Sequence, residues 1–170
     1  MARLALTHVE VYLFRRRGRR VELLILKRSP HRRVLPGVWQ PVTGKTNYRE
    51  RPIRAAAREV LEETGLSPRR WWMLETLTVY FDGAANAVKA LPLFAAEIGP
   101  RERPTLSSEH DDFRFVTARE AGRRFLWESQ RRALEALKRE VLGGGAHARA
   151  IEVAGPAAGS HGRRLPRTGS

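Results

Sequence analysis

The sequence predicts a mixed α/β sandwich domain followed by a C-terminal tail. Three observations favour this fold class. Runs rich in β-branched and aromatic residues alternate with helical patterns between residues 8 and 141, residues 52–64 form a clear helix, and a glycine-rich composition begins at Gly143. Such alternation is typical of a sheet covered by helices rather than of a helix bundle. With 170 residues, the chain is long enough to bury one hydrophobic core.

The expected elements follow from hydrophobic periodicity. It predicts strands at residues 8–14, 21–27, 39–42, 72–81, 91–98 and 113–117. The first two strands are joined by the arginine-rich connection Arg15–Arg20, with Gly18 in the turn. Helical spacing predicts helices at residues 52–64, 118–124 and 127–141. Pro52 suits the first turn of the first helix, and Gly65 suits its C-terminal end.

Residues 143–170 differ in composition from the rest of the chain. They are rich in glycine and alanine and contain no aromatic residue. A segment of this kind buries too little apolar surface to offset the entropy lost on ordering. We therefore expect a domain at residues 1–142 and a flexible tail at residues 143–170.

The overall composition excludes several classes of protein. The absence of cysteine excludes a disulfide scaffold, a thiolate zinc site and a cysteine nucleophile. No apolar stretch reaches the roughly 18 residues of a membrane span, so we expect a soluble, cytoplasmic protein without membrane contact. The net charge is +14, and 28 of the 32 basic residues are arginine. This excess favours anionic partners such as nucleotides, although solvated surface arginines would give the same composition.

Three glutamates share one face of the helix at residues 52–64. Glu59, Glu62 and Glu63 are three or four residues apart, and Glu59 and Glu63 repel each other by a few tenths of a kcal/mol in a bare helix. Arg58 can pair with Glu62 one turn later. Carboxylates that converge in this way favour a hard cation, Mg²⁺ or alternatively Mn²⁺. Taken alone, such a segment is more often a solvated helix face.

The residues around these glutamates have a specific spacing. Gly44 is followed after five residues by Glu50 and after seven more by the run Arg58-Glu59-Val60-Leu61-Glu62-Glu63-Thr64-Gly65-Leu66. This 23-residue pattern matches every fixed position of the Nudix box. The chain therefore resembles the Nudix hydrolases, which cleave a diphosphate linkage in a nucleoside diphosphate joined to another group.

The resemblance implies a fold and a set of site residues. The fold is the Nudix α/β/α sandwich with a mixed β-sheet and a loop–helix–loop catalytic box. Glu59, Glu62 and Glu63 are expected to bind Mg²⁺ or Mn²⁺, and Glu62 or Glu63 to help activate water. By the same resemblance, Arg58 holds the glutamate cluster in place and Gly44 lets the backbone approach the substrate.

Residues outside the box resemble one Nudix subgroup, the dihydroneopterin triphosphate pyrophosphatases. The run Trp39-Gln40-Pro41-Val42-Thr43-Gly44 is similar to their entry into the box, which makes Trp39 and Thr43 candidate substrate contacts. Arg28 occupies the strand end where those relatives bind substrate. Glu109 is similar to their further metal ligand or catalytic base.

Each of these residues also has a plainer interpretation. Trp39 suits a packed aromatic residue, Arg28 a solvated charge, and Glu109 a surface loop residue. The loop Lys45–Arg49 departs from the relatives, which carry acidic residues and a glycine there. This departure bears on the identity of the substrate.

Three functions follow from these patterns. The favoured one is a Mg-dependent pyrophosphohydrolase that acts on a nucleotide-like polyphosphate, a nucleoside or pterin triphosphate. An alternative is hydrolysis of a dinucleoside polyphosphate or a capped RNA end. A third is a non-catalytic Nudix-fold module that binds RNA or regulates. The intact glutamate set and the lack of an aromatic-interleaved RNA motif argue against the third, so nucleic acid is not the favoured partner.

Overall fold

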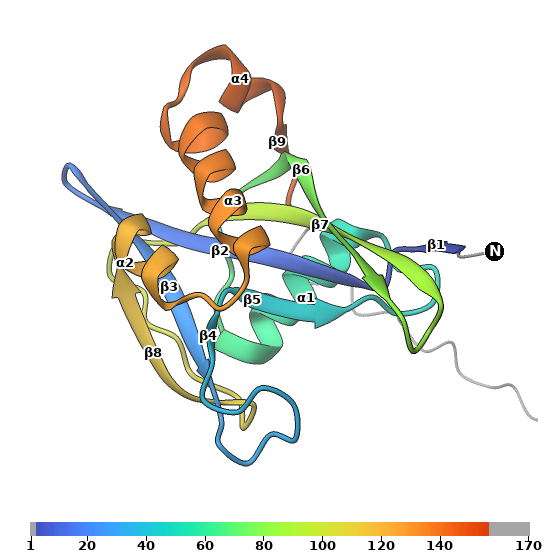
Figure 1. The fold of residues 1–170 in the computed structure, drawn as a ribbon. Helices are drawn as coiled ribbons and strands as arrows, with labels where there is room; N and C mark the ends of the chain where they lie inside the picture. Colours follow the sequence, from blue (N-terminus) through green and yellow to red (C-terminus); the bar gives the residue numbers. More distant parts are fainter. Residues whose placement is uncertain (1–2, 157–170) are drawn as a thin grey trace, which may run out of the picture.

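The computed structural model describes residues 3–156, which form a mixed β-sheet with helices on both faces (Figure 1). The strands are β1 (Arg3–Ala5), β2 (His8–Arg17), β3 (Arg20–Arg28), β4 (Trp39–Gln40), β5 (Val42–Lys45), β6 (Arg70–Asp82), β7 (Ala87–Glu97), β8 (His110–Val116) and β9 (Glu152–Val153). The helices are α1 (Pro52–Thr64), α2 (Ala118–Arg124), α3 (Glu128–Leu137) and α4 (Gly145–Ala150), with a π-helical turn at Lys138–Leu142. The expected α/β fold class is confirmed.

The sheet runs in the order β4-β3-β2-β7-β6-β9, with β5 on β2, β8 on β3 and β1 on β7. The β2–β7 and β1–β7 pairs are parallel and the other pairs are antiparallel, so the sheet is mixed. No helix within residues 3–156 is long and apolar enough to cross a membrane.

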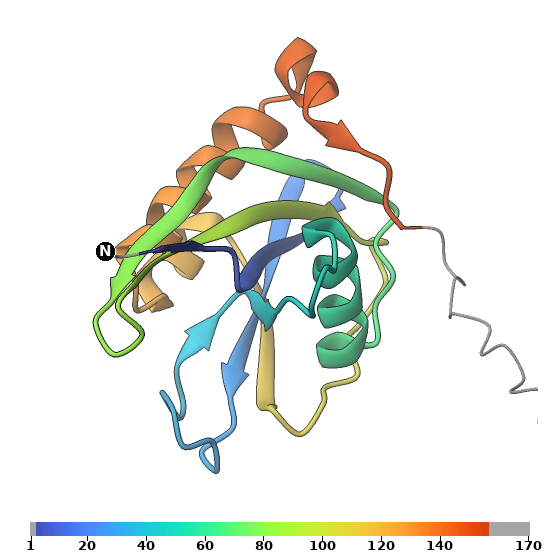
Figure 2. The ribbon, with the colours of Figure 1, turned by 90° about the vertical axis from the view of Figure 1, so that its right-hand side faces the viewer.

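Central strand β2 divides the core into two layers because its side chains alternate between the two sheet faces. Val9, Val11 and Leu13 pack with α1, whereas Tyr12 and Phe14 pack with α2 and α3. Figure 2 shows α1 on one side of the curved sheet and the C-terminal helices on the other. This arrangement fixes α1 against the sheet and therefore fixes the acidic face that it carries.

Helix α1 has the bounds that the sequence predicts. Pro52 lies in its first turn, and Gly65 ends it in the left-handed conformation, with φ of 67° and its N–H donated to the Leu61 carbonyl. Glycine adopts this conformation without a Cβ clash. The sharp end turns the chain away immediately after Glu63 and Thr64.

Several other boundaries differ from the expectation. The helix expected at residues 127–141 ends as an α-helix at Leu137 and continues as the π-helical turn. In that turn the Glu140 carboxylate is buried and accepts hydrogen bonds from the Glu75 backbone N–H and from Arg139. Strands β2 and β3 also extend into the connection Arg15–Arg20, because Arg15 pairs with Glu22 across the hairpin.

The glycine-rich segment is ordered in part, contrary to the expected tail at residues 143–170. Helix α4 packs beside the π-helical turn, and β9 pairs with Trp71 and Trp72 of β6. The sequence gives little sign of this, because the segment gains its order from a neighbouring strand edge rather than from its own apolar residues. Residues 157–170 of the expected tail lie outside the described residues.

Candidate active site

The acidic face of α1 lies directly beneath strand β5. Gly44 of β5 is buried, and a Cβ atom at this position would overlap the Glu59 side chain. The glycine therefore allows Glu59 to pack against the backbone of the sheet. Gly44, which begins the 23-residue pattern, therefore contacts Glu59, the first glutamate of the acidic face of α1.

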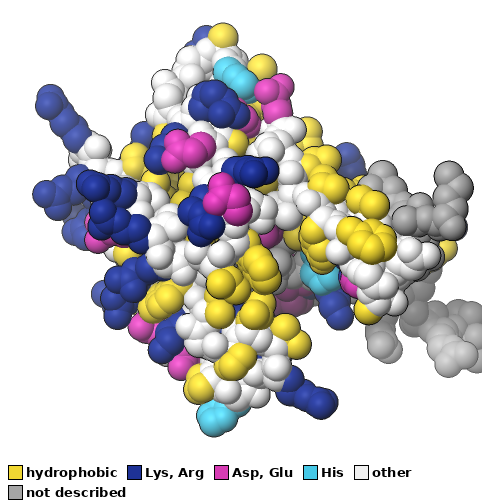
Figure 3. Space-filling model, in the orientation of Figure 1, with side chains coloured by type: hydrophobic (Ala, Val, Ile, Leu, Met, Phe, Trp, Pro, Cys, Tyr) yellow, Lys and Arg dark blue, Asp and Glu magenta, His cyan; other side chains and the backbone are white. Residues whose placement is uncertain are grey.

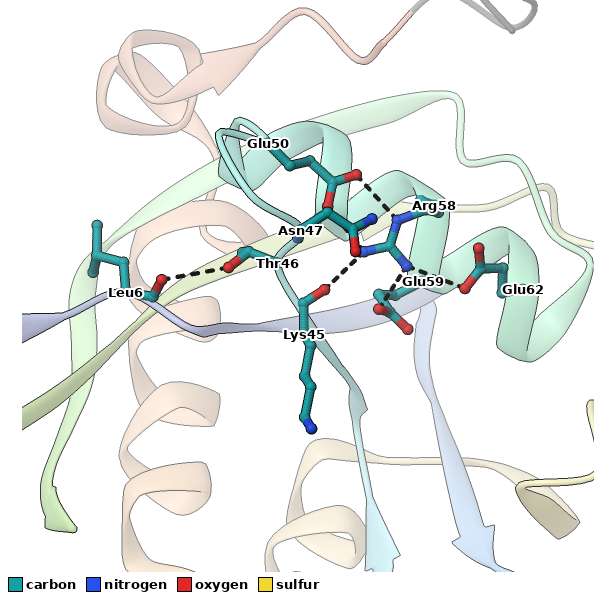
Figure 4. A network of polar contacts seen from close by, with 8 residues as sticks. All are labelled: Leu6, Lys45, Thr46, Asn47, Glu50, Arg58, Glu59 and Glu62. Carbon is teal, nitrogen blue, oxygen red and sulfur yellow. Dashed lines mark hydrogen bonds and ion pairs between the residues drawn. The ribbon is translucent and has the colours of Figure 1, made fainter. Parts of the chain in front are cut away.

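Arg58 holds the outer part of the acidic cluster (Figure 4). Its Nε and Nη2 donate to the two carboxylate oxygens of Glu50, at 3.0 and 2.9 Å. Its Nη1 donates to Glu59 at 2.7 Å and to Glu62 at 3.1 Å, and Nη2 also donates to the Lys45 carbonyl at 2.7 Å. One guanidinium thus fixes three carboxylates and the start of the loop that precedes α1. Helix spacing predicted the pairing with Glu62 alone, whereas the family resemblance implied that Arg58 holds the glutamate cluster.

Glu63 lies inside the protein rather than on the helix surface. Its side chain is buried, and its Oε2 atom has no hydrogen-bond partner. Burial, followed by the negative charges of Glu59 and Glu109, raises the pKa of Glu63 to about 9. Burial also raises the pKa of Glu59 despite its bond to Arg58. These carboxylates destabilise one another's charged forms, and a cation among them would relieve this repulsion.

His110 lies beside Glu63. Its Nδ1 atom is buried without a hydrogen-bond partner, 3.9 Å from Glu63 Oε2. Burial lowers the pKa of His110 to about 4, while that of Glu63 is raised. Both groups are therefore neutral near pH 7, and the contact is not an ion pair. Its Nε2 atom lies 3.4 Å from the Gln40 side-chain nitrogen. The sequence identifies this residue only as a neighbour of Glu109.

The candidate residues outside α1 come from two adjoining loops. Glu109 forms an ion pair with Arg32 at 3.2 Å, and its carbonyl accepts a hydrogen bond from the Ser29 N–H. Arg28 at the end of β3 donates from Nε to the Val34 carbonyl, and its positive charge acts against the raised pKa of Glu63. The structure therefore brings Arg28, Glu109 and the helix glutamates together. Arg32 was not anticipated, because loop residues follow no periodic pattern.

Trp39 and Thr43 face the other side of the sheet. Thr43 lies between Val42 and Gly44, which face α1, and its hydroxyl donates to the Pro41 carbonyl at 3.3 Å. The half-buried Trp39 packs against the core beneath α2 and α3. The guanidinium groups of Arg114 and Arg124 lie 5.2 and 5.7 Å from its ring centre. Trp39 thus packs against the core, which is the plainer of its two interpretations from the sequence. A substrate role for Trp39 and Thr43 stays a prediction.

The acidic residues fit a hard divalent cation in chemistry, although their present arrangement is not a closed metal site. Within residues 3–156, no three acidic or histidine side chains lie in a metal-binding arrangement, and Arg58 holds Glu59 and Glu62. The buried, partnerless Glu63 Oε2 would become an anionic ligand atom when a bound cation displaces the proton that the group holds near pH 7. Carboxylate oxygens are the ligands that Mg²⁺ and Mn²⁺ prefer.

The family assignment rests on a match that covers most of the chain. Residues 6–137 match the model of the NUDIX domain. The chain belongs to the Nudix family. Within the Nudix box, Gly44 packs against Glu59, and Arg58 binds three of the glutamates.

Two solved structures have a similar fold. An Ap4A hydrolase from C. elegans aligns over 82% of this chain and 100% of its own, with a TM-score of 0.69 and 19% identity. The dihydroneopterin triphosphate pyrophosphohydrolase of E. coli aligns over 81% of this chain and 95% of its own, with a TM-score of 0.62 and 20% identity. At these identities the likeness concerns the fold of the Nudix domain.

A curated protein is more similar in sequence but much longer. An octanoyltransferase from Myxococcus xanthus is 32% identical over 115 residues, which cover 64% of this chain and 30% of that protein. The Nudix chain thus spans less than a third of the curated relative that it matches.

Replacing Gly44 by alanine tests the contact between the Nudix box glycine and Glu59. The added Cβ displaces the Glu59 side chain, so we expect turnover to fall by about 10-fold or more. The displaced group is a flexible side chain, so we expect the melting temperature to change little. Gly83→Ala, in the turn between β6 and β7, is the matched control because its Cβ meets nothing closer than 3.8 Å. Full turnover in Gly44→Ala would show that the close approach has no role in activity.

Proposed function

We propose that this Nudix domain is a metal-dependent pyrophosphohydrolase that acts on a nucleoside or pterin triphosphate in the cytoplasm. The observation that carries the proposal is the buried Glu63 carboxylate, which has a partnerless oxygen and lies beside the charges of Glu59 and Glu109. Without a bound cation, keeping these carboxyl groups together lowers the stability of the fold, because burial and mutual repulsion oppose their charged forms. The intact cluster therefore favours catalysis over a binding module that has lost its activity.

The proposed metal ligands are Glu59, Glu62, Glu63 and Glu109. A bound Mg²⁺ or Mn²⁺ supplies charge neutralisation at the phosphate oxygens and lowers the pKa of an attacking water. Arg58 orients Glu59 and Glu62 through its fixed fork of donors. Glu63 and Glu109 are the two candidates for receiving the proton from water, because neither is bonded to Arg58. Glu63 could do so only while the bound cation keeps it in its charged form, since its pKa without a cation is about 9.

Positively charged residues around the cluster suit a polyphosphate chain. Arg28 ends β3, Arg32 lies on the loop that follows and pairs with Glu109, and Lys45 ends β5 before the loop that leads to Glu50. We propose that Arg28 contacts phosphate and that the backbone at Gly44 lies beside the same substrate. A contact from Thr43, which faces the other side of the sheet, stays a prediction from the sequence. Each charged hydrogen bond to phosphate contributes about 1.5–3 kcal/mol, so substrates with fewer phosphate charges should bind less well.

A substrate panel with Mg²⁺, scored by product chromatography, tests the substrate class. We expect nucleoside or pterin triphosphates to give a monophosphate and pyrophosphate, because water attacks the phosphorus nearest the nucleoside or pterin. Dinucleoside tetraphosphates would instead give a triphosphate with a monophosphate, or two diphosphates. Turnover of these compounds or of sugar diphosphates about ten times better than every triphosphate would overturn the substrate class, while the family assignment would stand.

A further inference from the structure

Strand β6 has an open edge along its second half. Its inner edge pairs with β7 as far as Asp82. On its outer edge, β9 pairs with Trp71 and Trp72, and the Met73 N–H donates to the Ile151 carbonyl. From Thr76 to Asp82, no strand within residues 3–156 pairs with this outer edge. Unpaired N–H and C=O groups along an edge are a template for another strand.

The same segment carries exposed hydrophobic side chains. Leu77, Val79 and Phe81 point to one face of the sheet and are 51, 56 and 60% exposed, and Tyr80 on the opposite face is 43% exposed. Figure 3 shows hydrophobic side chains gathered over this end of the β6–β7 hairpin. Contiguous exposed apolar residues on a soluble domain commonly mark an interaction surface.

Charge distinguishes this surface from the rest of the molecule. The chain has a net charge of +14, yet residues 76–81 contain no charged side chain. Two copies that approached through arginine-rich surfaces would repel each other, whereas this edge brings no charge against its own copy. Segment 157–170 is a poor match for the surface, because its only large apolar residue is Leu165 and it carries three arginines.

We propose that two copies of this chain associate through their β6 edges, antiparallel and about a two-fold axis at Val79. This register places Val79 opposite the partner's Val79 and Leu77 opposite the partner's Phe81. All three pairs on that face are then apolar, and on the other face Thr78 meets the partner's Tyr80. A two-fold contact of this kind is self-complementary, as a closed dimer requires. The two sheets become one continuous sheet across the interface.

The lack of cysteine allows a direct test of the register. In Val79→Cys the two introduced thiols face each other across the axis, and directly opposed antiparallel residues have Cα atoms about 4.5–5.5 Å apart. A disulfide accepts Cα separations of about 4.4–6.8 Å, so we expect mild oxidation to convert Val79→Cys to a covalent dimer that a reductant separates. Val34→Cys, in a loop where Val34 is 65% exposed, is the control and should stay monomeric on the gel. Equal cross-linking of both variants, or none at position 79, would overturn the proposed register.

A second measurement tests the association without any cross-link. Sedimentation equilibrium of the unmodified chain should show a monomer–dimer equilibrium. The double variant Leu77→Lys/Val79→Lys places like charges across the axis, so we expect its dissociation constant to rise by about tenfold or more. Both side chains are exposed in the monomer, so its melting temperature at low protein concentration should be retained. The matched variant Val34→Lys/Leu126→Lys changes two exposed apolar residues elsewhere and should dimerise as the unmodified chain does. A monomeric unmodified chain would overturn the proposal, and so would equal dimerisation of all three proteins.

Discussion

Replacing Glu63 by glutamine should lower turnover by about 10²-fold or more while the metal-free protein becomes more stable. Glu63 is buried, and its Oε2 atom has no partner. The amide keeps the size of the side chain but cannot carry the negative charge that a metal ligand or base requires. It also removes a group whose charged form is opposed by burial and by Glu59 and Glu109. Steady-state kinetics and thermal unfolding in chelator measure the two effects.

The stability gain should depend on pH in a defined direction. The pKa of Glu63 rises from 4.5 in the unfolded chain to about 9 in the folded protein. Within this window the folded state holds a proton that the unfolded state has released, so the contribution of Glu63 to stability falls as pH rises. The advantage of Glu63→Gln should therefore grow between about pH 5 and about pH 9. If Glu63→Gln had the same unfolding stability as the parent across this pH range, or the same turnover, the assignment of Glu63 to a strained catalytic site would be wrong.

Replacing Arg58 by alanine should damage both stability and activity. The change removes hydrogen bonds to Glu50, Glu59 and Glu62, and Glu50 and Glu59 are largely shielded from water. Carboxylates left without a partner in such surroundings destabilise the fold, here by about 2–3 kcal/mol. Turnover should fall by about 10²-fold, because Glu59 and Glu62 lose the group that orients them. Urea unfolding and steady-state kinetics measure both losses.

Two further variants separate geometry from charge at this position. Arg58→Lys keeps the positive charge but loses the two-pronged contact with Glu50, so its stability and turnover should lie between those of the parent and Arg58→Ala. Arg132→Ala removes a surface ion pair to Glu128 at 3.7 Å, and it should change stability by less than about 0.5 kcal/mol. An Arg58→Ala protein that behaved like Arg132→Ala would show that the network in Figure 4 holds nothing in place.

The parts of the fold that the sequence predicted are those with strong local signals. Helix α1 has its expected ends because Pro52 and Gly65 act on the backbone directly. The short strand β9 and helix α4 were not foreseen, because neither is ordered by its own composition: β9 is ordered by the edge of β6 at Trp71 and Trp72, and α4 packs beside the π-helical turn. Contacts between residues distant in sequence leave little periodic signal in either segment.

In the candidate site, too, the sequence predicts the features that have a local signal and misses those that depend on contacts between distant residues. The spacing of Glu59, Glu62 and Glu63 places them on one helix, but it does not show that Glu63 is buried while Glu62 is exposed. That difference depends on how α1 is rotated against the sheet. The ion pair of Glu109 with Arg32 and the buried position of His110 arise where separate loops meet. Neither follows from a motif, so the structure was needed to find them.

Metal dependence of hydrolysis is the most direct test of the proposed site. Product release from the best triphosphate should be measured for the same preparation first in excess chelator and then after titration with Mg²⁺ or Mn²⁺. If Glu59, Glu62, Glu63 and Glu109 hold the catalytic cation, chelation abolishes release and either metal restores it, whereas Glu63→Gln stays about 10²-fold or more slower than the parent at every metal concentration. Undiminished product release in excess chelator, or full recovery of Glu63→Gln with metal, would contradict a metal site at these carboxylates.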